Sequence, residues 1–210
     1  MNKKTYYHFV LDRSGSMKSC WNDTLNGWSD QIVKINKIAN EHPDQEIYLS
    51  MCIFDDKIEF SGGIIKMQEE TSLPSIENVV PRGSTALFDA IGESIKKLDF
   101  VVSNEIKNNE ASVIMVILTD GYENASRKFT SVEIKKEMDK LRETELWNFV
   151  FIGADFDITE TAGYFNADAS NRRNVSKNNM SSVYNDLQSG FEKYIALKKK
   201  GRINRRFFDS

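Results

Sequence analysis

Short apolar runs alternate along this chain with longer stretches in which apolar residues recur every three or four positions. The short runs lie at 6–11, 47–54, 113–118 and 147–153, and they are rich in β-branched and aromatic residues. Runs of this length and composition are typical of strands buried on both faces. Because helical stretches separate the runs, the pattern predicts a mostly parallel sheet covered by helices on both faces.

The helical stretches carry apolar stripes with a period near 3.6 residues. The first stripe runs from Trp21 to Ala39, and Pro43 ends the helix. Later helices are expected from about Thr85, over 129–144, over 158–164 and in a final stripe around Phe191. In the helix over 129–144, the expected core residues are Val132, Ile134, Met138 and Leu141.

Two segments predict edge strands. Residues 57–65 follow the tight Asp55-Asp56 turn and are expected to pair antiparallel with the run at 47–54. Asn174 and Val175 are expected to form a short further strand. The complete pattern therefore predicts an α/β fold: a single Rossmann-like domain whose central sheet is mostly parallel, with one antiparallel edge strand.

Length and charge fit this picture. A chain of 210 residues with 40% hydrophobic and 28% charged residues is long enough for one α/β domain with a full core. We see no internal repeat and predict one domain over 1–197, followed by a basic tail over 198–210. The tail holds six basic residues and only Asp209 as an acid, whereas the whole chain has a net charge of −3. An acidic body therefore carries a basic tail.

The cysteines and the N-terminus bear on location. Cys20 and Cys52 are too few for a disulfide framework, and we expect free thiols in a reducing compartment. No segment is apolar and long enough to span a bilayer. A cleaved signal peptide would remove Asp12 or its strand, so we expect none. These observations predict an intracellular, cytoplasmic protein.

The first apolar run ends in a loop that carries oxygen ligands. Asp12, Ser14 and Ser16 place one carboxylate and two hydroxyls at alternate positions. Ligands of this kind suit a hard cation such as Mg²⁺ or Mn²⁺. Two of the three are neutral, so a bound cation would keep much of its positive charge and could accept an acidic group from outside. The loop therefore predicts binding before it predicts catalysis.

Two further segments belong to the same edge of the sheet. Asp120 follows the apolar run at 113–118, and Thr85 opens a helical pattern after Pro81. In doubly wound sheets, ligands bind outside the carboxyl ends of the strands. Asp12 and Asp120 both fall at such ends, and Thr85 begins a helix that can pack beside them.

These segments together resemble the metal-ion-dependent adhesion site (MIDAS) of von Willebrand factor A (VWA) domains, which has the form Asp-x-Ser-x-Ser followed by a distant Thr and a distant Asp. All five positions are present in order: Asp12, Ser14, Ser16, Thr85 and Asp120. The resemblance covers most of the chain, from about Tyr6 to the last helix. The resemblance implies that the chain adopts a VWA fold and that the domain binds protein partners.

The resemblance also implies roles for the five residues. Ser14, Ser16 and Thr85 would be hydroxyl ligands of Mg²⁺, or of Mn²⁺ or Ca²⁺, directly or through water. Asp12 and Asp120 would bind directly or through water. A partner protein would supply Asp or Glu to the open position. Small stand-alone intracellular VWA proteins of bacteria and phages are the context we expect.

Simpler structural roles stay open for several of these residues. The two serines suit a helix cap, Thr85 suits an N-cap and Asp120 suits a turn. Near the motif, we expect Arg13 to point outward toward an acidic partner and Glu123 to be a solvated loop acid rather than a ligand. Trp21 and Trp28 are expected in the core, although Trp21 could instead line the rim of the site.

The sequence gives little support for an enzymatic function. No Gly-x-Ser-x-Gly elbow or Walker-type loop is present, and the only histidines are His8 and His42, which are not close in sequence to the motif serines. Ser14 stands where an Asp-x-Asp phosphatase loop would need its second acid. We therefore predict a non-enzyme and keep a metal-dependent hydrolase as a third reading.

The second reading concerns the basic tail. Its lysines and arginines, with Phe207 and Phe208, could hold nucleic acid through phosphate contacts and stacking. We favour a solvated helix end followed by a disordered tail. A further alternative is that the two phenylalanines dock on a partner or on this domain.

Overall fold

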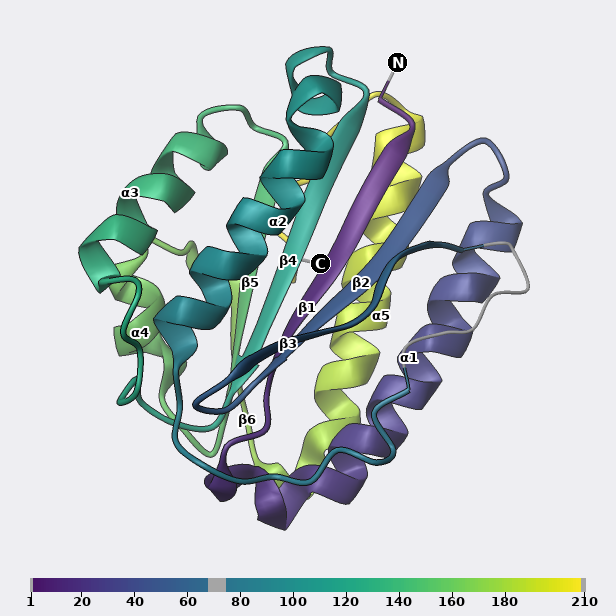
Figure 1. The fold of residues 1–210 in the computed structure, drawn as a ribbon. Coiled ribbons are helices and arrows are strands. Elements are labelled where there is room, and N and C mark those ends of the chain that lie inside the picture. The colour runs from purple at the N-terminus through teal and green to yellow at the C-terminus, as the bar shows by residue number, and fades with distance from the viewer. Residues whose placement is uncertain (1, 68–74, 209–210) are drawn as a thin grey trace.

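The computed structural model describes residues 2–67 and 75–208 and contains a six-stranded sheet with the order β3-β2-β1-β4-β5-β6 (Figure 1). Neighbouring strands are parallel except for β2 and β3, which are antiparallel. The strands are β1 (Lys4–Asp12), β2 (Glu46–Phe54), β3 (Ile58–Lys66), β4 (Ala111–Thr119), β5 (Trp147–Ala154) and β6 (Arg172–Val175).

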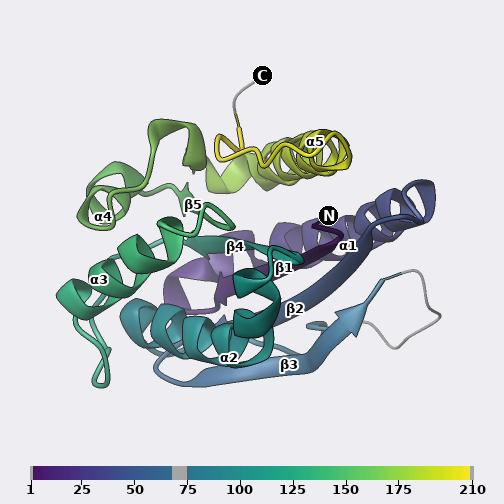
Figure 2. The same ribbon diagram turned by 90° about the horizontal axis from the view of Figure 1, so that it is seen from above.

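Helices cover both faces of the sheet. The α-helices are α1 (Trp21–Glu41), α2 (Leu87–Lys107), α3 (Ser131–Arg142), α4 (Ile158–Tyr164) and α5 (Met180–Lys199). Three short 3-10 helices are η1 (Gly15–Cys20), η2 (Ala169–Asn171) and η3 (Lys177–Asn179). Figure 2 shows α1 and α5 on one side of the sheet and α2 and α3 on the other, while α4 packs beside β5 and β6.

Strand β1 illustrates how the sheet divides the core. Tyr7 and Phe9 belong to the cluster beneath α1 and α5, whereas Tyr6 and Val10 belong to the cluster beneath α2 and α3. Tyr7 stacks on Phe191 of α5 with ring centroids 4.4 Å apart. Burial on both faces explains why the strand reads as one continuous apolar run.

The register of β1 and β4 determines where the motif residues meet. Leu11 pairs with Leu118 in parallel register. Asp12 therefore lies beside Thr119, and Asp120 lies one residue beyond, at the same carboxyl edge of the sheet. Two segments more than 100 positions apart in sequence thus deliver their side chains to one place.

The predicted fold class is confirmed: the chain forms an α/β domain with a mostly parallel sheet, an antiparallel edge strand and helices on both faces. One core assignment is wrong, because the side chain of Val132 is 73% exposed. The buried stripe of α3 consists of Ile134, Met138 and Leu141 at spacings of four and three. Val132 precedes this stripe by two positions and therefore faces away from it.

The segment after α5 folds back onto the domain, and its last two residues, 209–210, lie outside the described part. Phe207 is 1% exposed, and its ring and carbonyl fill the space beside Gly190 where a larger residue would clash. Lys198 is also buried. The expectation of a solvated helix end and a disordered tail is therefore wrong for these residues, whereas docking of Phe207 on this domain is confirmed.

Candidate metal centre

Asp12 ends β1 with its side chain fully buried. Its Oδ1 accepts a hydrogen bond from the backbone N–H of Ser14 at 2.6 Å, and its Oδ2 accepts one from Thr119 Oγ1 at 2.6 Å. Burial raises the pKa of Asp12 to about 6, and the negative charge of Asp120 adds to this rise, while the hydrogen bonds from Thr119 and Ser14 oppose it. A charged Asp12 would gain from a cation beside it.

The two motif hydroxyls and the second carboxylate form one cluster. Ser14 Oγ lies 3.0 Å from Ser16 Oγ. Ser16 Oγ donates to Asp120 Oδ1 at 2.7 Å, and Ser14 Oγ approaches the same oxygen at 3.5 Å. Ser14 is the N-cap of η1, but its side chain makes no capping hydrogen bond. The hydroxyls therefore turn toward the carboxylate, which argues against the simpler role of the serines as helix caps.

Thr85 reaches the cluster from the loop before α2. The backbone N–H of Gly15 donates to Gly83 O at 3.2 Å, which ties this loop to the motif loop. A carbon added at Gly121 would lie 3.8 Å from Thr85 Oγ1 and 4.0 Å from Ser16 Oγ, so both hydroxyls face the same space. The N-cap of α2 is Ala86. Thr85 therefore does not cap the helix.

The structure brings all five predicted residues together, and their donor set fits a divalent cation. Asp120 Oδ2 is buried and makes no hydrogen bond among the described residues, although the ammonium of Lys177 lies 2.5 Å away. This ammonium therefore occupies Oδ2 as an ion pair. Asp120 Oδ1, which faces the hydroxyls of Ser14 and Ser16, is therefore the oxygen placed for a cation, and oxygen-only donors match Mg²⁺, Mn²⁺ or Ca²⁺.

The number of acids in the cluster is small. Within residues 2–67 and 75–208, no three His, Cys, Asp or Glu side chains gather in a way that could hold a metal ion. Any cation here would thus depend on hydroxyl ligands as much as on Asp12 and Asp120.

Arg13 differs from its expected orientation. Its side chain is buried, with Nε donating to Asp55 Oδ2 at 3.0 Å and the guanidinium pairing with Glu59 at 2.6 Å. These two acids lie at the end of β2 and the start of β3. The expected outward orientation is therefore wrong, because the neighbouring hairpin supplies the acids that pair with this arginine. The pair ties the motif loop to that hairpin.

Glu123 also differs from its expected role. Its Oε1 accepts from the backbone N–H groups of Ala125 and Ser126 at 2.8 and 2.6 Å, and its Oε2 accepts from the N–H of Phe88 at 2.9 Å. It is neither a solvated loop acid nor directed at the cation cluster. Instead it joins the loop after β4 to the first turn of α2.

We expect Glu123→Gln to lower the free energy of unfolding by about 1–2 kcal/mol, because one of its oxygens becomes an amide that faces donors. Its affinity for divalent cations should stay unchanged. Urea unfolding and metal titration check the two outcomes. The control is Glu143→Gln at the exposed end of α3, which should change stability by less than about 0.5 kcal/mol. Weaker metal binding in the Glu123 variant would show that Glu123 belongs to the centre.

Two residues of the cluster were missed by sequence reasoning. Thr119 holds Asp12, and the register of two adjacent parallel strands was the signal that could have found it. Lys177 contacts Asp120 from η3. It stands in a polar stretch between 167 and 179 with no motif of its own, so nothing in the sequence marked it. Trp21, in contrast, is buried as expected, and its Nε1 donates to Val79 O at 2.8 Å.

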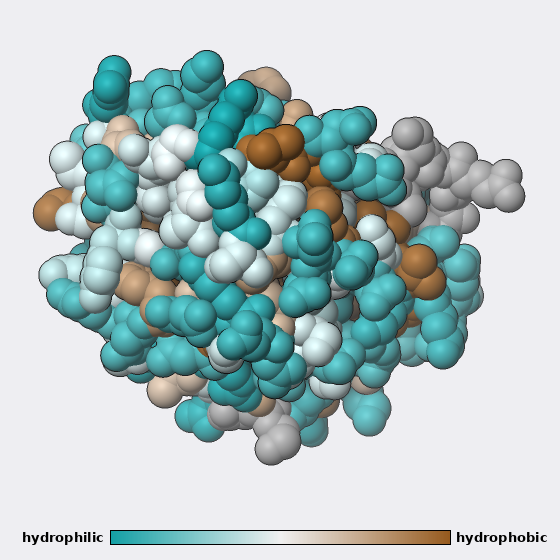
Figure 3. Space-filling model, turned by 90° about the horizontal axis from the view of Figure 1, so that it is seen from below, coloured by the Kyte–Doolittle hydropathy of each residue, from teal (hydrophilic) through white to brown (hydrophobic). Residues whose placement is uncertain are grey.

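The surface around the centre is mostly hydrophilic, with an exposed aromatic ring and a groove. Figure 3 views the molecule from the carboxyl ends of the parallel strands and shows a largely hydrophilic face with smaller apolar areas. Tyr122 is 58% exposed, and its ring meets that of Phe156 edge to face at 4.5 Å. Next to Thr85, a groove of about 880 Å³ is lined in part by Ser84 and Asn124.

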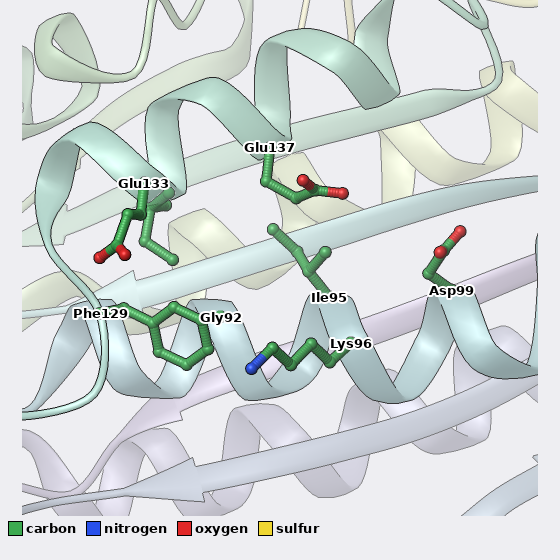
Figure 4. Close-up of a pocket in the computed structure, with 8 residues that line it drawn as sticks. Gly92, Ile95, Lys96, Asp99, Phe129, Glu133 and Glu137 are labelled. Atoms are coloured by element: carbon green, nitrogen blue, oxygen red, sulfur yellow. The ribbon is translucent and has the colours of Figure 1, made fainter.

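A separate cavity of about 280 Å³ lies between α2 and α3 (Figure 4). Its lining includes Phe129, over whose ring the Lys96 ammonium lies at 4.4 Å from the centroid. Two of its acids are engaged, Glu133 with Thr130 and Glu137 with Lys140. None of its lining residues belongs to the candidate metal centre.

Solved structures share this arrangement of sheet and helices at low sequence identity. The von Willebrand factor domain of the type V pili tip protein Mfa5 from Porphyromonas gingivalis matches with a TM-score of 0.67 and 8% identity, over 93% of this chain and 97% of that chain. A von Willebrand factor type A structure from Catenulispora acidiphila matches with a TM-score of 0.58 and 10% identity, over 90% of this chain and 42% of that one. The chain has a VWA fold.

A third VWA-like structure carries a metal. Proximal thread matrix protein 1 from the mussel byssus, with a zinc-occupied MIDAS motif, matches this chain with a TM-score of 0.58 and 18% identity, over 91% of this chain and 46% of that one. The VWA fold found here thus spans about half the length of the mussel protein. No protein-family model and no curated protein matches the sequence. Among the described helices, none is long and apolar enough to cross a membrane.

Proposed function

We propose that this chain is a non-enzymatic, divalent-cation-dependent protein-binding module. Asp12, Ser14, Ser16, Thr85 and Asp120 would hold Mg²⁺, or Mn²⁺ or Ca²⁺, and a partner protein would supply an Asp or Glu as a further ligand. One observation carries the proposal: two carboxylates and three hydroxyls converge at one edge of the sheet, and both carboxylates are buried.

The chemistry of the ligands supports a binding role. A bound divalent cation supplies a positive charge that attracts an anionic oxygen. The three hydroxyls are neutral, and Asp12 shares its negative charge with the donors Thr119 and Ser14 N–H. None of the five proposed ligands is a third carboxylate, so the partner's Asp or Glu would add the next one. The exposed ring of Tyr122 and the groove beside Thr85 would then contact the partner around its acidic residue.

The neighbours in structure support the same reading. One of them has a zinc-occupied MIDAS, and another is a pilus adhesin, SpaC from Lactobacillus rhamnosus GG, with a TM-score of 0.69. Adhesion is stated for that protein, and we extend only the binding mode to this chain. A cytoplasmic location and a bacterial or phage source stay predictions, since several of the neighbours are pilus proteins.

The alternative readings gain less support. For a hydrolase, Ser14 or Ser16 would be the nucleophile, but the carboxylates that meet their hydroxyls, Asp12 and Asp120, are the proposed cation ligands. His8 is buried in β1, where it pairs with Ser50, and His42 caps the far end of α1. For nucleic-acid binding, Phe207 is buried and cannot stack on a base.

Calorimetric titration with Mn²⁺ and Mg²⁺ tests the proposal. We expect saturable binding by the wild type and its loss in Asp120→Ala. Asp157→Asn is the matched control, because Asp157 also lies in a loop at this edge but caps α4 and contacts Thr159. Partner capture should then fail in EDTA and in the Asp120 variant alike. Partner binding that survives both would refute the proposed function.

A further inference from the structure

A lysine that lies outside the motif enters the candidate centre. Lys177 is the first residue of η3, immediately before α5. Its ammonium lies 2.5 Å from Asp120 Oδ2 and donates to the backbone carbonyl of Ser16 at 3.0 Å. The side chain is only 16% exposed. This lysine thus contacts two of the five motif residues and brings its ammonium group into the cluster.

The backbone of Lys177 is held in position. Its N–H donates to Asp155 Oδ1 at 3.0 Å, and Asp155 in turn donates its own N–H to Val175 O at 2.8 Å. Ser176 caps η3 by accepting from the N–H of Asn178. The loop after β5 and the end of β6 therefore fix where this side chain starts. The contact with Asp120 therefore comes from a lysine whose backbone is fixed by hydrogen bonds, unlike that of a freely rotating surface lysine.

The two oxygens of Asp120 face different groups. Oδ1 meets the hydroxyls of Ser14 and Ser16, which are the proposed cation ligands, whereas Oδ2 meets Lys177. One carboxylate can therefore serve a cation and the ammonium together. Asp12, the other carboxylate of the cluster, is bonded to Thr119 and to the N–H of Ser14. The lysine then does not need to leave when a cation binds.

The charge of the loaded centre follows from these contacts. Two carboxylates alone would neutralise a divalent cation, and the centre would carry no net charge. With the ammonium of Lys177 included, the centre keeps one positive charge. Two acids in the neighbouring loops are bound to other groups: Glu123 to the N–H groups of its own loop and α2, and Asp155 to the N–H of Lys177.

We propose that Lys177 sets the charge of this centre, so that the cation-loaded site selects an anionic ligand over a neutral one. The proposal rests on the proposed function and assigns the partner preference of that site to a residue outside its motif. Lys177 also opposes the cation through like-charge repulsion. Its removal should therefore strengthen cation binding and weaken carboxylate binding, and these opposite changes distinguish it from a residue that only supports the fold.

The test compares the wild type with Lys177→Gln and with Lys18→Gln, which removes an exposed lysine of η1 at the same loop. Mn²⁺ is titrated by electron paramagnetic resonance. Acetate and acetamide are then titrated into the Mn²⁺-loaded protein, with displacement of bound water followed by proton relaxation. We expect Lys177→Gln to bind Mn²⁺ about tenfold more tightly and to lose about tenfold of its preference for acetate over acetamide. Lys18→Gln should behave as the wild type.

Each other outcome has a definite meaning. Equal Mn²⁺ affinity and equal acetate preference in the wild type and Lys177→Gln would overturn this proposal while leaving the proposed function in place. Mn²⁺ binding by Lys177→Gln but not by the wild type would also overturn it, because the lysine would then replace the cation. Absence of Mn²⁺ binding in every variant would refute the proposed function, and with it this proposal.

Discussion

Asp12→Asn should stabilise the metal-free protein at neutral pH by about 3 kcal/mol and at the same time remove cation binding. Burial raises the pKa of Asp12 from 3.8 to about 6. The folded protein thus binds this proton more tightly than the unfolded chain does. The stability that the proton contributes is present below pH 3.8 and is lost as the pH rises from 3.8 to 6.

Asparagine suits the same surroundings without a charge. Its Oδ1 can accept from the N–H of Ser14, and its amide can donate to Thr119 Oγ1, which can turn to donate to the carbonyl of Gly121 at 3.2 Å. The gain in the variant should therefore be large at pH 7.5 and small at pH 4. A divalent cation added to the wild type should offset the destabilisation caused by the buried charge of Asp12, because the cation binds only the folded state.

Urea unfolding in EDTA at pH 4, 5, 6 and 7.5 measures this effect, and a repeat with Mn²⁺ should raise the stability of the wild type alone. Asp157→Asn serves as the control, since hydrogen bonds from Thr159 lower the pKa of that exposed carboxyl and its loss should give no gain. If the difference in free energy of unfolding between Asp12→Asn and the wild type were the same at pH 7.5 as at pH 4, the buried charge of Asp12 would not destabilise the protein as we infer.

Lys198→Met should change the pH dependence of stability at the opposite end of the sheet. Lys198 is 2% exposed, and its ammonium donates to Lys4 O at 2.5 Å, Thr5 Oγ1 at 2.6 Å and Ser112 Oγ at 2.9 Å. None of the ion pairs in the described part of the chain includes it. Burial lowers the pKa of Lys198 from 10.5 to about 7.

The direction of the effect follows from that shift. Between pH 7 and 10.5 the unfolded chain binds the proton of this lysine more tightly than the folded protein does, so stability rises with pH. Between pH 7 and 9.5 this contribution amounts to about 3 kcal/mol. Methionine has a similar length and no charge, and the hydroxyl of Ser112 can still donate to Lys4 O.

Guanidinium unfolding of the wild type and Lys198→Met at pH 7, 8 and 9.5 checks this prediction. The stability of the wild type should rise relative to that of the variant over this range. Lys199→Met is the control, because Lys199 is exposed and pairs with Asp44 on the surface, and its profile should run parallel to that of the wild type. Parallel profiles for Lys198→Met would contradict the inferred cost of the buried ammonium.

The sequence predicted the fold well because its signals are local and repeated. Each parallel strand appears as an apolar run, and each helix shows an apolar stripe, so their alternation determines the layers. Even the short strand at Asn174 and Val175 is confirmed as part of β6. The errors concern residues whose burial depends on tertiary contacts. Val132 lies two positions before the buried stripe of α3, and Phe207 packs on α5, which ends eight residues before it.

The residues of the candidate site also fall into those that the sequence predicts and those that it does not. The five motif positions could be placed at one edge from the topology alone, and the structure brings them together. Arg13 and Glu123 could not be assigned, because each is bound by groups that lie more than 30 positions away in sequence, Asp55 for the first and the N–H of Phe88 for the second. The contact of Lys177 with Asp120 could be predicted only from the path of the chain around β6, which no local sequence pattern indicates.

The direction of β1 has a practical consequence for presenting this protein to a partner. The strand enters the sheet at Lys4 and reaches the centre at Asp12, so it spans about 30 Å from one end of the molecule to the other. The first described residue, Asn2, therefore lies at the end away from the centre, as Figure 1 shows. A chain tethered to a sensor surface through its N-terminus would direct the centre into solution, where a partner of any size could reach it.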